Sequence, residues 1–221
     1  MKKEFAVIGL GRFGGSICRE LSEEGMQVLA IDINEERVND YKNIATYAVI
    51  ADTTDELALK ELDIQDFDHV IVAIGDDIQA SILTTVILAE LQVKKITVKA
   101  QNDYHEKILN KIGAHHVVHP ERDMGRRIAH SLISNNILDY LELSEDHSIV
   151  EVRAGHKMIG RSLLDLNIRA KYGCNVVAIQ KENNEMNVSP HPEDKILEKD
   201  ILIIIGSNKG INRLERDLID M

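Results

Sequence analysis

The chain has 221 residues, of which 44% are apolar, and a formal net charge of −11. This acidic balance excludes a broad nucleic-acid-binding surface, which needs a basic patch, and no apolar run in the sequence is long enough to span a bilayer. The two cysteines, Cys18 and Cys174, form no C-x-x-C pair, which favours a reducing, cytoplasmic compartment. Residues 1–4 lead directly into an apolar stretch, so we expect no signal peptide.

The glycine-rich run Gly9–Gly14 has the pattern G-x-G-x-x-G. It follows an apolar stretch, Phe5–Ile8, expected to be a buried strand, and it opens a helical pattern from Ser16 to Leu21. In this setting the glycines permit a tight turn, close approach of a phosphate and packing of the helix on the sheet. The free N–H groups at the helix start then face the phosphates. The run predicts a nucleotide site, and the simpler alternative is a turn that only packs a strand–helix–strand unit.

An acidic residue stands at the end of the second apolar strand. Val28–Ile31 is followed by Asp32, at the distance from the glycines where an acid accepts hydrogen bonds from ribose hydroxyls. Its charge disfavours a 2′-phosphate, so NADP is not expected. The alternative role for Asp32 is a cap on the next helix, expected from Glu35 to Tyr41.

Strands and helices continue to alternate as far as Pro120. Strands are expected over 45–50, 69–74, 95–100 and 116–118, and helices over 79–91 and 103–112, with a further helix that ends near Leu62 and is capped by Thr53, Thr54 or Asp55. Six strands alternating with helices predict an α/β fold with a Rossmann-like, doubly wound parallel sheet. Ligands of such sheets bind outside the carboxyl ends of the strands, where the sequence places Asp32, Asp52, Gly75, Asp76 and Lys99. Three nearby histidines, His115, His116 and His119, lack zinc-finger spacing and are interpreted as ordinary strand-edge residues.

The pattern changes after the first 120 residues. Pro120 is expected to interrupt the elements, and a helix over 126–135 is expected to lie in a linker, 121–137, and to bridge two domains or two subunits. A small α+β domain is expected over 138–221. It is expected to contain strands over 148–153, 175–179 and 201–205, a capping box at 162–165, a turn over 182–185 and a closing helix over 211–219.

Nearly the whole chain resembles one family of regulatory domains. The stretches that carry the resemblance are Phe5–Gly14, Ala73–Asp76, Lys99–Ala100, His119–Glu121, Ile159–Leu163 and Arg169–Gly173. They are similar to the RCK (regulator of potassium conductance) family, also called KTN, and to its C-terminal subdomain, often named TrkA-C. The pairing and the length resemble the soluble subunit of Ktr-type potassium uptake systems.

The resemblance implies a non-enzymatic regulatory subunit. In this family, dimers form an octameric ring that docks on a separate membrane-embedded potassium-translocating subunit, which implies a cytoplasmic protein attached peripherally to the cell membrane. ATP and ADP compete for the N-terminal site, and relatives bind NAD(H). Cyclic di-AMP binds the C-terminal subdomain of related Gram-positive proteins and inactivates transport.

The resemblance also implies roles for individual residues. Arg12 contacts the terminal phosphate, a role that suits a guanidinium inside a phosphate loop, and Asp32 and Asn34 contact ribose and base. Glu121 is implied to bind Mg²⁺ or Ca²⁺ at a subunit interface, since hard cations prefer oxygen ligands. The full nucleotide site is expected to comprise Gly9, Gly11, Arg12, Phe13, Gly14, Asp32, Ile33, Asn34, Asp52, Thr53, Ile74, Gly75, Asp76, Lys99, Ala100, Gln101, His105 and Glu121. The cyclic di-AMP pocket is expected to be framed by Arg169, Asn175, Val176 and Pro190.

Plainer interpretations stay open at this point. Arg12, His105, Glu121 and Arg169 are alternatively solvated surface residues, and Gly75 is alternatively a plain turn. An NAD-dependent oxidoreductase is the main alternative function, but it needs a substrate domain with a placed acid–base group. A redox-sensing transcription factor is the other, but it needs a basic helix-turn-helix that neither end of the sequence offers.

Overall fold

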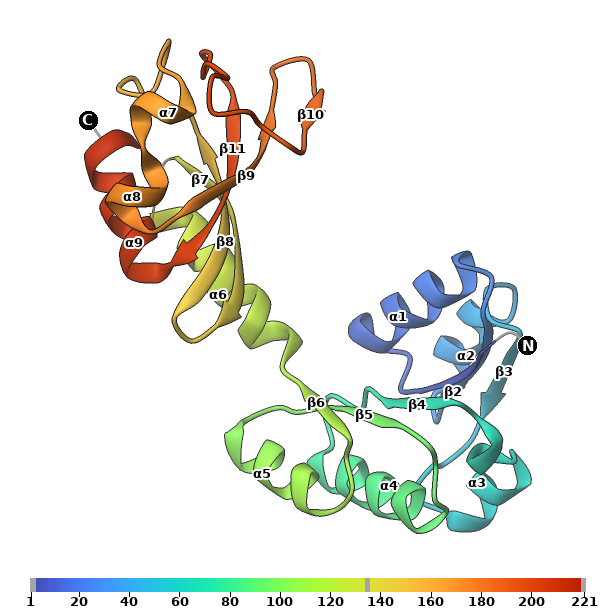
Figure 1. The fold of residues 1–221 in the computed structure, drawn as a ribbon. Coiled ribbons are helices and arrows are strands. Elements are labelled where there is room, and N and C mark those ends of the chain that lie inside the picture. Colours follow the sequence, from blue (N-terminus) through green and yellow to red (C-terminus); the bar gives the residue numbers. More distant parts are fainter. Residues whose placement is uncertain (1–2, 134–135, 220–221) are drawn as a thin grey trace. The chain divides into compact units, whose positions relative to one another are not determined.

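The computed structural model describes residues 3–133 and 136–219 and divides into two compact units (Figure 1). The first unit is Met1–Pro120 and the second is Glu121–Met221. Within the described ranges, no helix combines the length and the apolar character needed to cross a membrane.

The first unit alternates strands and helices throughout. Its elements are β1 (Glu4–Ile8), α1 (Arg12–Glu23), β2 (Gln27–Asp32), α2 (Glu35–Tyr41), β3 (Tyr47–Ile50), α3 (Glu56–Glu61), the 3-10 turn η1 (Ile64–Asp66), β4 (His69–Val72), α4 (Ile78–Glu90), β5 (Ile96–Lys99), α5 (Asp103–Lys111) and β6 (His116–Val118). All neighbouring strands are parallel, in the order β3-β2-β1-β4-β5-β6. This confirms the predicted doubly wound sheet, whose strand order reverses between β1 and β4. The carboxyl ends of strands on either side of such a reversal are where ligands of this fold bind.

Apolar side chains cover both faces of this sheet. Alternate strand residues such as Val7 and Ala30 pack with Cys18 and Tyr41 under α1 and α2, and Figure 1 shows these helices on one side of the strands and α3, α4 and α5 on the other. The second face carries the larger cluster, with Ile8, Ile31, Leu88 and Leu109 among its buried members. Burial on both faces explains why the strands read as continuous apolar runs in the sequence.

Side-chain caps begin most helices of the first unit. Asn34 accepts a hydrogen bond from the N–H of Arg37 at the start of α2, and the side chains of Asp55, Asp77 and Asn102 do the same for α3, α4 and α5. The cap of α2 is therefore Asn34 and not Asp32, and Asp55 is the cap among the three candidates before α3. Within the described chain, α1 differs from these four helices because its first residue follows Gly11, which supplies no side-chain cap.

Helix α6 (Pro120–Ile133) begins earlier than the sequence predicts. Pro120 starts this helix instead of interrupting the pattern, because a proline at the first helical position loses no helical hydrogen bond and already has a helical φ. The C-terminal part of the predicted helix, 134–135, lies outside the described residues. None of the α6 side chains that the structure describes is buried.

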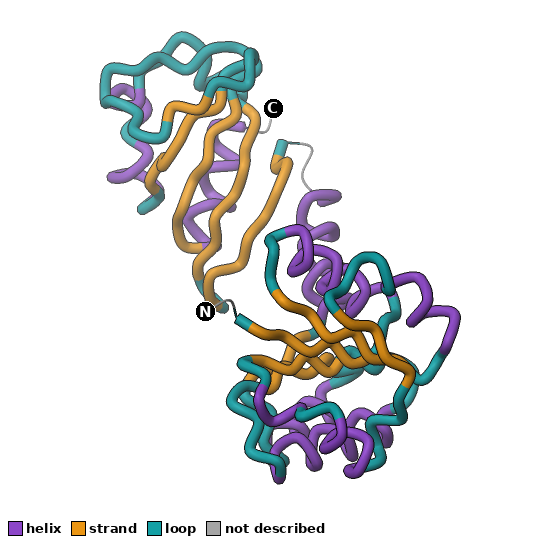
Figure 2. Tube along the Cα trace, turned by 90° about the vertical axis from the view of Figure 1, so that its right-hand side faces the viewer, coloured by secondary structure: helices purple, strands orange, loops and turns teal. Residues whose placement is uncertain are grey.

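The second unit is a small α+β domain, as predicted. Beyond α6 it contains β7 (Ile137–Ser144), β8 (His147–Arg153), α7 (Leu163–Leu166), α8 (Ile168–Tyr172), β9 (Asn175–Gln180), β10 (Met186–Asn187), β11 (Ile201–Ser207), α9 (Asn208–Leu214) and the π-helical turn η2 (Glu215–Ile219). The sheet is antiparallel, in the order β10-β9-β11-β8-β7. Figure 2 shows this sheet with helices packed against it, and Leu202, Ile204, Leu166 and Ile211 lie in the shared core.

Strand β7 and the capping box of α7 are two local features to compare with the sequence predictions for this unit. Strand β7 was not predicted, and it pairs with β8 through two register shifts. Ion pairs join α6 to β7, between Arg126 and Glu142 at 2.8 Å and between Arg127 and Asp139. The predicted capping box is confirmed, since Ser162 and Asp165 exchange side-chain and backbone hydrogen bonds at the start of α7.

Candidate functional site

Two glycines of the glycine-rich run, one in the loop after β1 and one in the first turn of α1, are required by packing. Gly9 has a φ of +91°, and a Cβ there would lie 3.0 Å from the backbone carbonyl of Ala73, at the end of β4. A Cβ on Gly14 would overlap the carbonyl oxygen of Gly9. These positions let the first turn of α1 pack tightly against the loop and the neighbouring strand end.

Gly11 differs from the other two because no contact in the described part of the chain requires a glycine there. Among the described residues, no heavy atom outside its own neighbours and helix backbone lies within 4 Å of a Cβ added at Gly11. Its backbone is extended, and it accepts the first helical hydrogen bond, from the N–H of Gly15 at 2.7 Å. The space over Gly11 therefore adjoins the uncapped helix start, where N–H groups bind phosphate well.

Asp32 ties the end of β2 to the glycine loop. The residue is 6% exposed. Its Oδ2 accepts a hydrogen bond from the Leu10 N–H at 2.7 Å, and its Oδ1 accepts one from the Asn34 N–H at 2.9 Å. Arg37 adds an Nη1 at 3.5 Å from Oδ2. Since a carboxylate has about four lone-pair sites, the side chain keeps capacity for a ribose hydroxyl.

Of the predicted site residues that follow β2 and β3, some are exposed and one is buried. Ile33 is 69% exposed, and the Asn34 side-chain oxygen caps α2. Asp52 is exposed, and hydrogen bonds from the Thr54 hydroxyl and N–H hold the pKa of its carboxyl below its usual value. Thr53 is buried, and its hydroxyl lies 2.9 Å from that of Thr84 on α4. Thr53 thus fixes the β3 end to α4, while Asp52 stays open to solvent.

The ends of β4 and β5 approach one another. The Gln101 amide donates a hydrogen bond to the Gly75 carbonyl, and a Cβ on Gly75 would lie 3.6 Å from the Lys99 Nζ. That ammonium lies 6.0 Å from the centre of the Phe13 ring on α1, a cation–π contact. Lys99 thereby brings positive charge toward the helix that begins at the glycine loop. The two remaining predicted residues flank these ends: Ile74 is half-buried and Asp76 is exposed.

His105 and Ala100 belong to the interior. Ala100 is 2% exposed and donates its N–H to the carbonyl of Val118 at 2.9 Å. His105 is 1% exposed, so the interpretation of it as a surface residue is wrong. Its Nδ1 accepts a hydrogen bond from the Gln101 N–H at 3.3 Å, and burial lowers the pKa of the imidazole, with a further contribution from His119. His105 is therefore a buried, neutral imidazole that holds the backbone after β5 in place through its hydrogen bond with Gln101.

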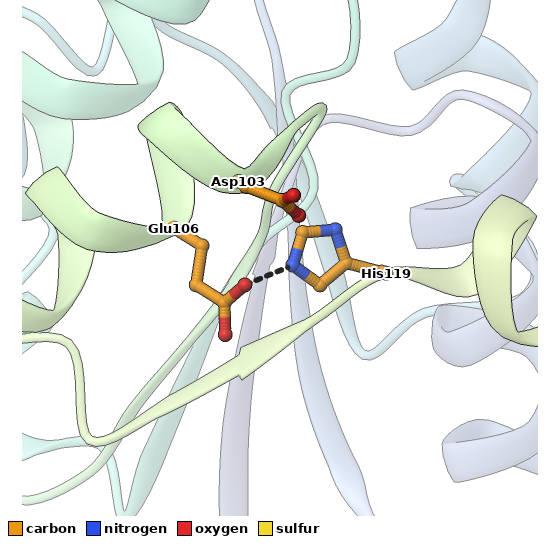
Figure 3. Close-up of side chains that lie close together, drawn as sticks. All are labelled: Asp103, Glu106 and His119. Carbon is orange, nitrogen blue, oxygen red and sulfur yellow. Dashed lines mark hydrogen bonds and ion pairs between the residues drawn. The ribbon is translucent and has the colours of Figure 1, made fainter.

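Acidic side chains lie on both sides of the end of β6: Glu121 follows it on α6, and two carboxylates of α5 lie near His119. Glu121 is an exposed residue in the first turn of α6. His119 is 5% exposed, and its Nε2 lies 2.8 Å from Oε2 of Glu106, with Asp103 beside the ring (Figure 3). His119 directly follows the edge strand β6, and its burial against Glu106 was not predicted from the sequence. The i, i+3 spacing of Asp103 and Glu106 on a predicted helix was the available sequence signal, but nothing in the sequence pairs them with His119.

The residues proposed for a second ligand meet at one cavity of the second unit. The cavity has a volume of about 400 Å³. Arg169, Asn175, Val176 and Pro190 all line it. The remaining lining residues are mainly apolar: Leu163, Leu164, Asn167, Ile168, Cys174 and Pro192. Apolar walls with a few polar groups are typical of small-molecule sites.

Comparison with known proteins gives two domain matches and two close relatives. The TrkA-N domain matches residues 5–120 and the TrkA-C domain matches residues 147–218. The chain is 64% identical over 219 residues to Ktr system potassium uptake protein C of Bacillus subtilis (strain 168), covering 99% of each chain. It is 56% identical over 215 residues to Ktr system potassium uptake protein A of the same organism, covering 97% of this chain and 96% of that protein.

Solved structures show the same fold. A GsuK channel bound to NAD has a TM-score of 0.70 at 16% identity, covering 100% of this chain and 40% of that chain. The TrkA-N domain of the inner membrane protein ybaL from Escherichia coli has a TM-score of 0.53 at 19% identity, covering 60% of this chain and 97% of that chain. With its two domain matches and its whole-length relatives, the chain belongs to the family of Ktr system potassium uptake proteins.

Proposed function

We propose that this protein is the regulatory subunit of a Ktr-type potassium uptake system and that ATP and ADP bind its first unit as gating ligands. Membership of the Ktr family supports the role in potassium uptake. The observation that carries the nucleotide site is the start of α1, where the uncapped N–H groups adjoin open space at Gly11. Asp32 lies beside this loop and is bonded to its backbone. NADH shares the phosphates and the ribose, so it is a further candidate ligand.

The difference between ATP and ADP supplies the signal. A ligand shifts a protein between two states only by its unequal affinity for them. Arg12 is exposed at the first position of α1, where a guanidinium can pair with the terminal phosphate that ADP lacks. Glu121 supplies a carboxylate for Mg²⁺ or Ca²⁺ bound to the same phosphates, in the manner of hard oxygen ligands. The extra phosphate and its cation thus favour one state of the assembly.

The surface of α6 supports a homo-oligomer. Met124, Ile128 and Leu132 are spaced by four residues along one stripe of the helix, and they are 50%, 49% and 77% exposed in the single chain. A second copy that covers this stripe would remove apolar surface from water. We therefore place α6 at the subunit contact of dimers that assemble into an octameric ring. The ring acts on a separate membrane-embedded potassium-translocating subunit from the cytoplasmic side.

The cavity of the second unit supports an inhibitory cyclic di-AMP site. Arg169 supplies a guanidinium for a phosphate, and Asn175 supplies amide hydrogen-bonding groups. Ile168 and Pro190 provide apolar walls against which a purine can pack. The volume of about 400 Å³ falls in the range of small-molecule pockets.

The nucleotide site is tested by adding a side chain where the chain itself has room. Gly11→Val should leave the fold intact and abolish binding of ATP and ADP in calorimetric titration, because the side chain occupies the space for phosphate. Gly125→Val, which adds the same side chain at another position with open space in the single chain, controls for the effect of the added valine on folding. Undiminished ATP binding by Gly11→Val would remove the site from this loop. Steady turnover of NADH with an aldehyde or a 2-oxo acid would instead support an oxidoreductase.

A further inference from the structure

A group of three metal-ligating side chains lies in the first unit, between α5 and the end of β6. Asp103 and Glu106 are three residues apart on α5, so they project from the same side of the helix. His119 follows β6 and faces them, as Figure 3 shows. One ligand atom from each of the three residues lies within 4.8 Å of the others.

The three side chains of this group differ in how deeply they are buried. His119 is 5% exposed and is held in place by Glu106, which is partly buried, whereas Asp103 is exposed. A buried imidazole oriented by packing and flanked by carboxylates is a pre-positioned nitrogen ligand. The exposed Asp103 side leaves an entry path from solvent for an ion and its water ligands.

The distances suit a metal ion of the size of Zn²⁺. If Zn²⁺ lies about 2.0–2.1 Å from both His119 Nε2 and the Glu106 oxygen, their present separation of 2.8 Å corresponds to an angle of about 85–90° at the metal. Widening that separation to about 3.3 Å gives the tetrahedral angle. A small rotation of Glu106 therefore exchanges the hydrogen bond for two metal bonds, in the tautomer of the neutral His119 ring that carries its proton on Nδ1.

We propose that Asp103, Glu106 and His119 form a binding site for Zn²⁺, with water in the remaining coordination position. One imidazole and two carboxylates suit a borderline transition metal better than Mg²⁺ or Ca²⁺, which prefer ligand sets made of oxygen alone. The two carboxylates balance the charge of the ion. His119 directly precedes Pro120, the first residue of α6. Bound Zn²⁺ would therefore hold the start of α6 against helix α5. The site would thus respond to a metal independently of the nucleotide.

The test is a titration of the full-length, chelator-treated protein with Zn²⁺ alone, without nucleotide. Wild type should bind one tightly held ion per chain and should show a raised melting temperature. Asp103→Asn changes an exposed side chain, so it should fold normally and bind Zn²⁺ about tenfold or more weakly, because one ligand is lost. His119→Gln should lose the site, and Co²⁺ bound to wild type should give a visible spectrum that His119→Gln lacks.

Two control variants separate this site from adventitious binding. His116→Gln removes an exposed imidazole of strand β6, which precedes His119, and Glu121→Gln removes the carboxylate proposed for the nucleotide-linked cation. Both should bind Zn²⁺ as wild type does. Equal Zn²⁺ affinity in wild type and Asp103→Asn would overturn the proposal, as would an affinity that falls in His116→Gln but not in Asp103→Asn. Neither result would bear on nucleotide binding at Gly11.

Discussion

The Oδ2 atom of Asp32 accepts a hydrogen bond of 2.7 Å from the backbone N–H of Leu10, inside the glycine-rich loop. The second carboxylate oxygen accepts the N–H of Asn34. One buried side chain therefore fixes the position of the loop between β1 and α1 and of the turn between β2 and α2. Asp32 therefore positions the backbone of the candidate nucleotide site even when no ribose is bound.

We expect Asp32→Asn to lower both stability and nucleotide affinity. An amide has a single acceptor oxygen, so one of the two backbone N–H groups loses its partner, which costs about 1–3 kcal/mol in a buried setting. Urea unfolding and calorimetric titration with ATP measure the two effects. For the stability effect, Asp52→Asn is the matched control, because Thr54 donates both of its hydrogen bonds to one oxygen that the amide retains. Equal stability of Asp32→Asn and wild type would contradict this account.

Arg12→Ala should weaken ATP more than ADP. If the guanidinium pairs with the terminal phosphate, its loss removes a charged hydrogen bond worth about 1.5–3 kcal/mol from ATP binding alone. Parallel titrations of both nucleotides measure the difference. Arg19→Ala serves as control, since Arg19 lies further along α1 and packs over the Tyr41 ring. Equal losses for ATP and ADP would make Arg12 a general phosphate contact.

Glu121→Gln should uncouple the cation from the nucleotide. The substitution keeps the volume of the side chain but removes the charge on which hard cations depend. We expect the variant to bind ATP and to lose the rise in melting temperature that Mg²⁺ or Ca²⁺ adds to the ATP form. Thermal melts with ATP, with and without the cation, measure this. If the cation shifts both proteins equally, Glu121 is an ordinary surface residue.

Arg169→Ala should abolish binding of cyclic di-AMP and leave ATP binding unchanged. Arg169 lines the cavity of the second unit, and removing it takes away a charged partner for a phosphate. Lys171→Ala is the control, because Lys171 is an exposed cation on the same helix that does not line the cavity. Calorimetric titration of the three proteins decides the matter. Retained affinity in Arg169→Ala would place the ligand elsewhere.

His69 should make stability fall in mild acid. Burial lowers the pKa of this imidazole below its ordinary value of 6.5, and the charges of Lys95, His115, His116 and Lys3 add to the effect. Its Nε2 lies 2.7 Å from the Thr97 hydroxyl. Because the unfolded chain binds the proton more readily, stability from the neutral ring is complete above the unfolded pKa and decreases as the pH falls through it.

The measurement is the free energy of unfolding in urea from about pH 7.5 to about pH 5.5. His69→Gln removes the titrating group, so its stability should decline less over this interval than that of wild type. His156→Gln, which removes an exposed imidazole of the second unit, should follow the wild-type profile. Parallel profiles for His69→Gln and wild type would rule out this contribution.

The sequence predicted the first unit well because its signals are local. Apolar runs buried on both faces mark the strands, and glycine or a capping side chain marks where each helix begins. Strand β7 was missed because its register shifts at Ile137 and again near Ser144, which disturbs the alternation by which a half-buried strand is recognised. Its outward residues Leu141 and Leu143 are also exposed leucines, which obscure the pattern further.

The candidate sites were predictable to different degrees. Gly11 and Asp32 follow from a motif with a fixed structural setting. The burial of His119 did not, because it depends on α5 folding back over the end of β6 and bringing Glu106 to the ring. Tertiary contacts of this kind leave no periodic signal in a single sequence.

Strand β1 lies at the centre of the six-stranded sheet, between β2 and β4. Its pairing with β2 closes over a short stretch of chain, while its pairing with β4 requires the segment from His69 onward. During synthesis, the β1–α1–β2 unit can therefore form before the strand that covers the other edge of β1 has emerged. Until then the unpaired edge of Phe5–Ile8 is open to other chains. A strand that is central in the finished sheet is therefore an exposed edge strand during synthesis.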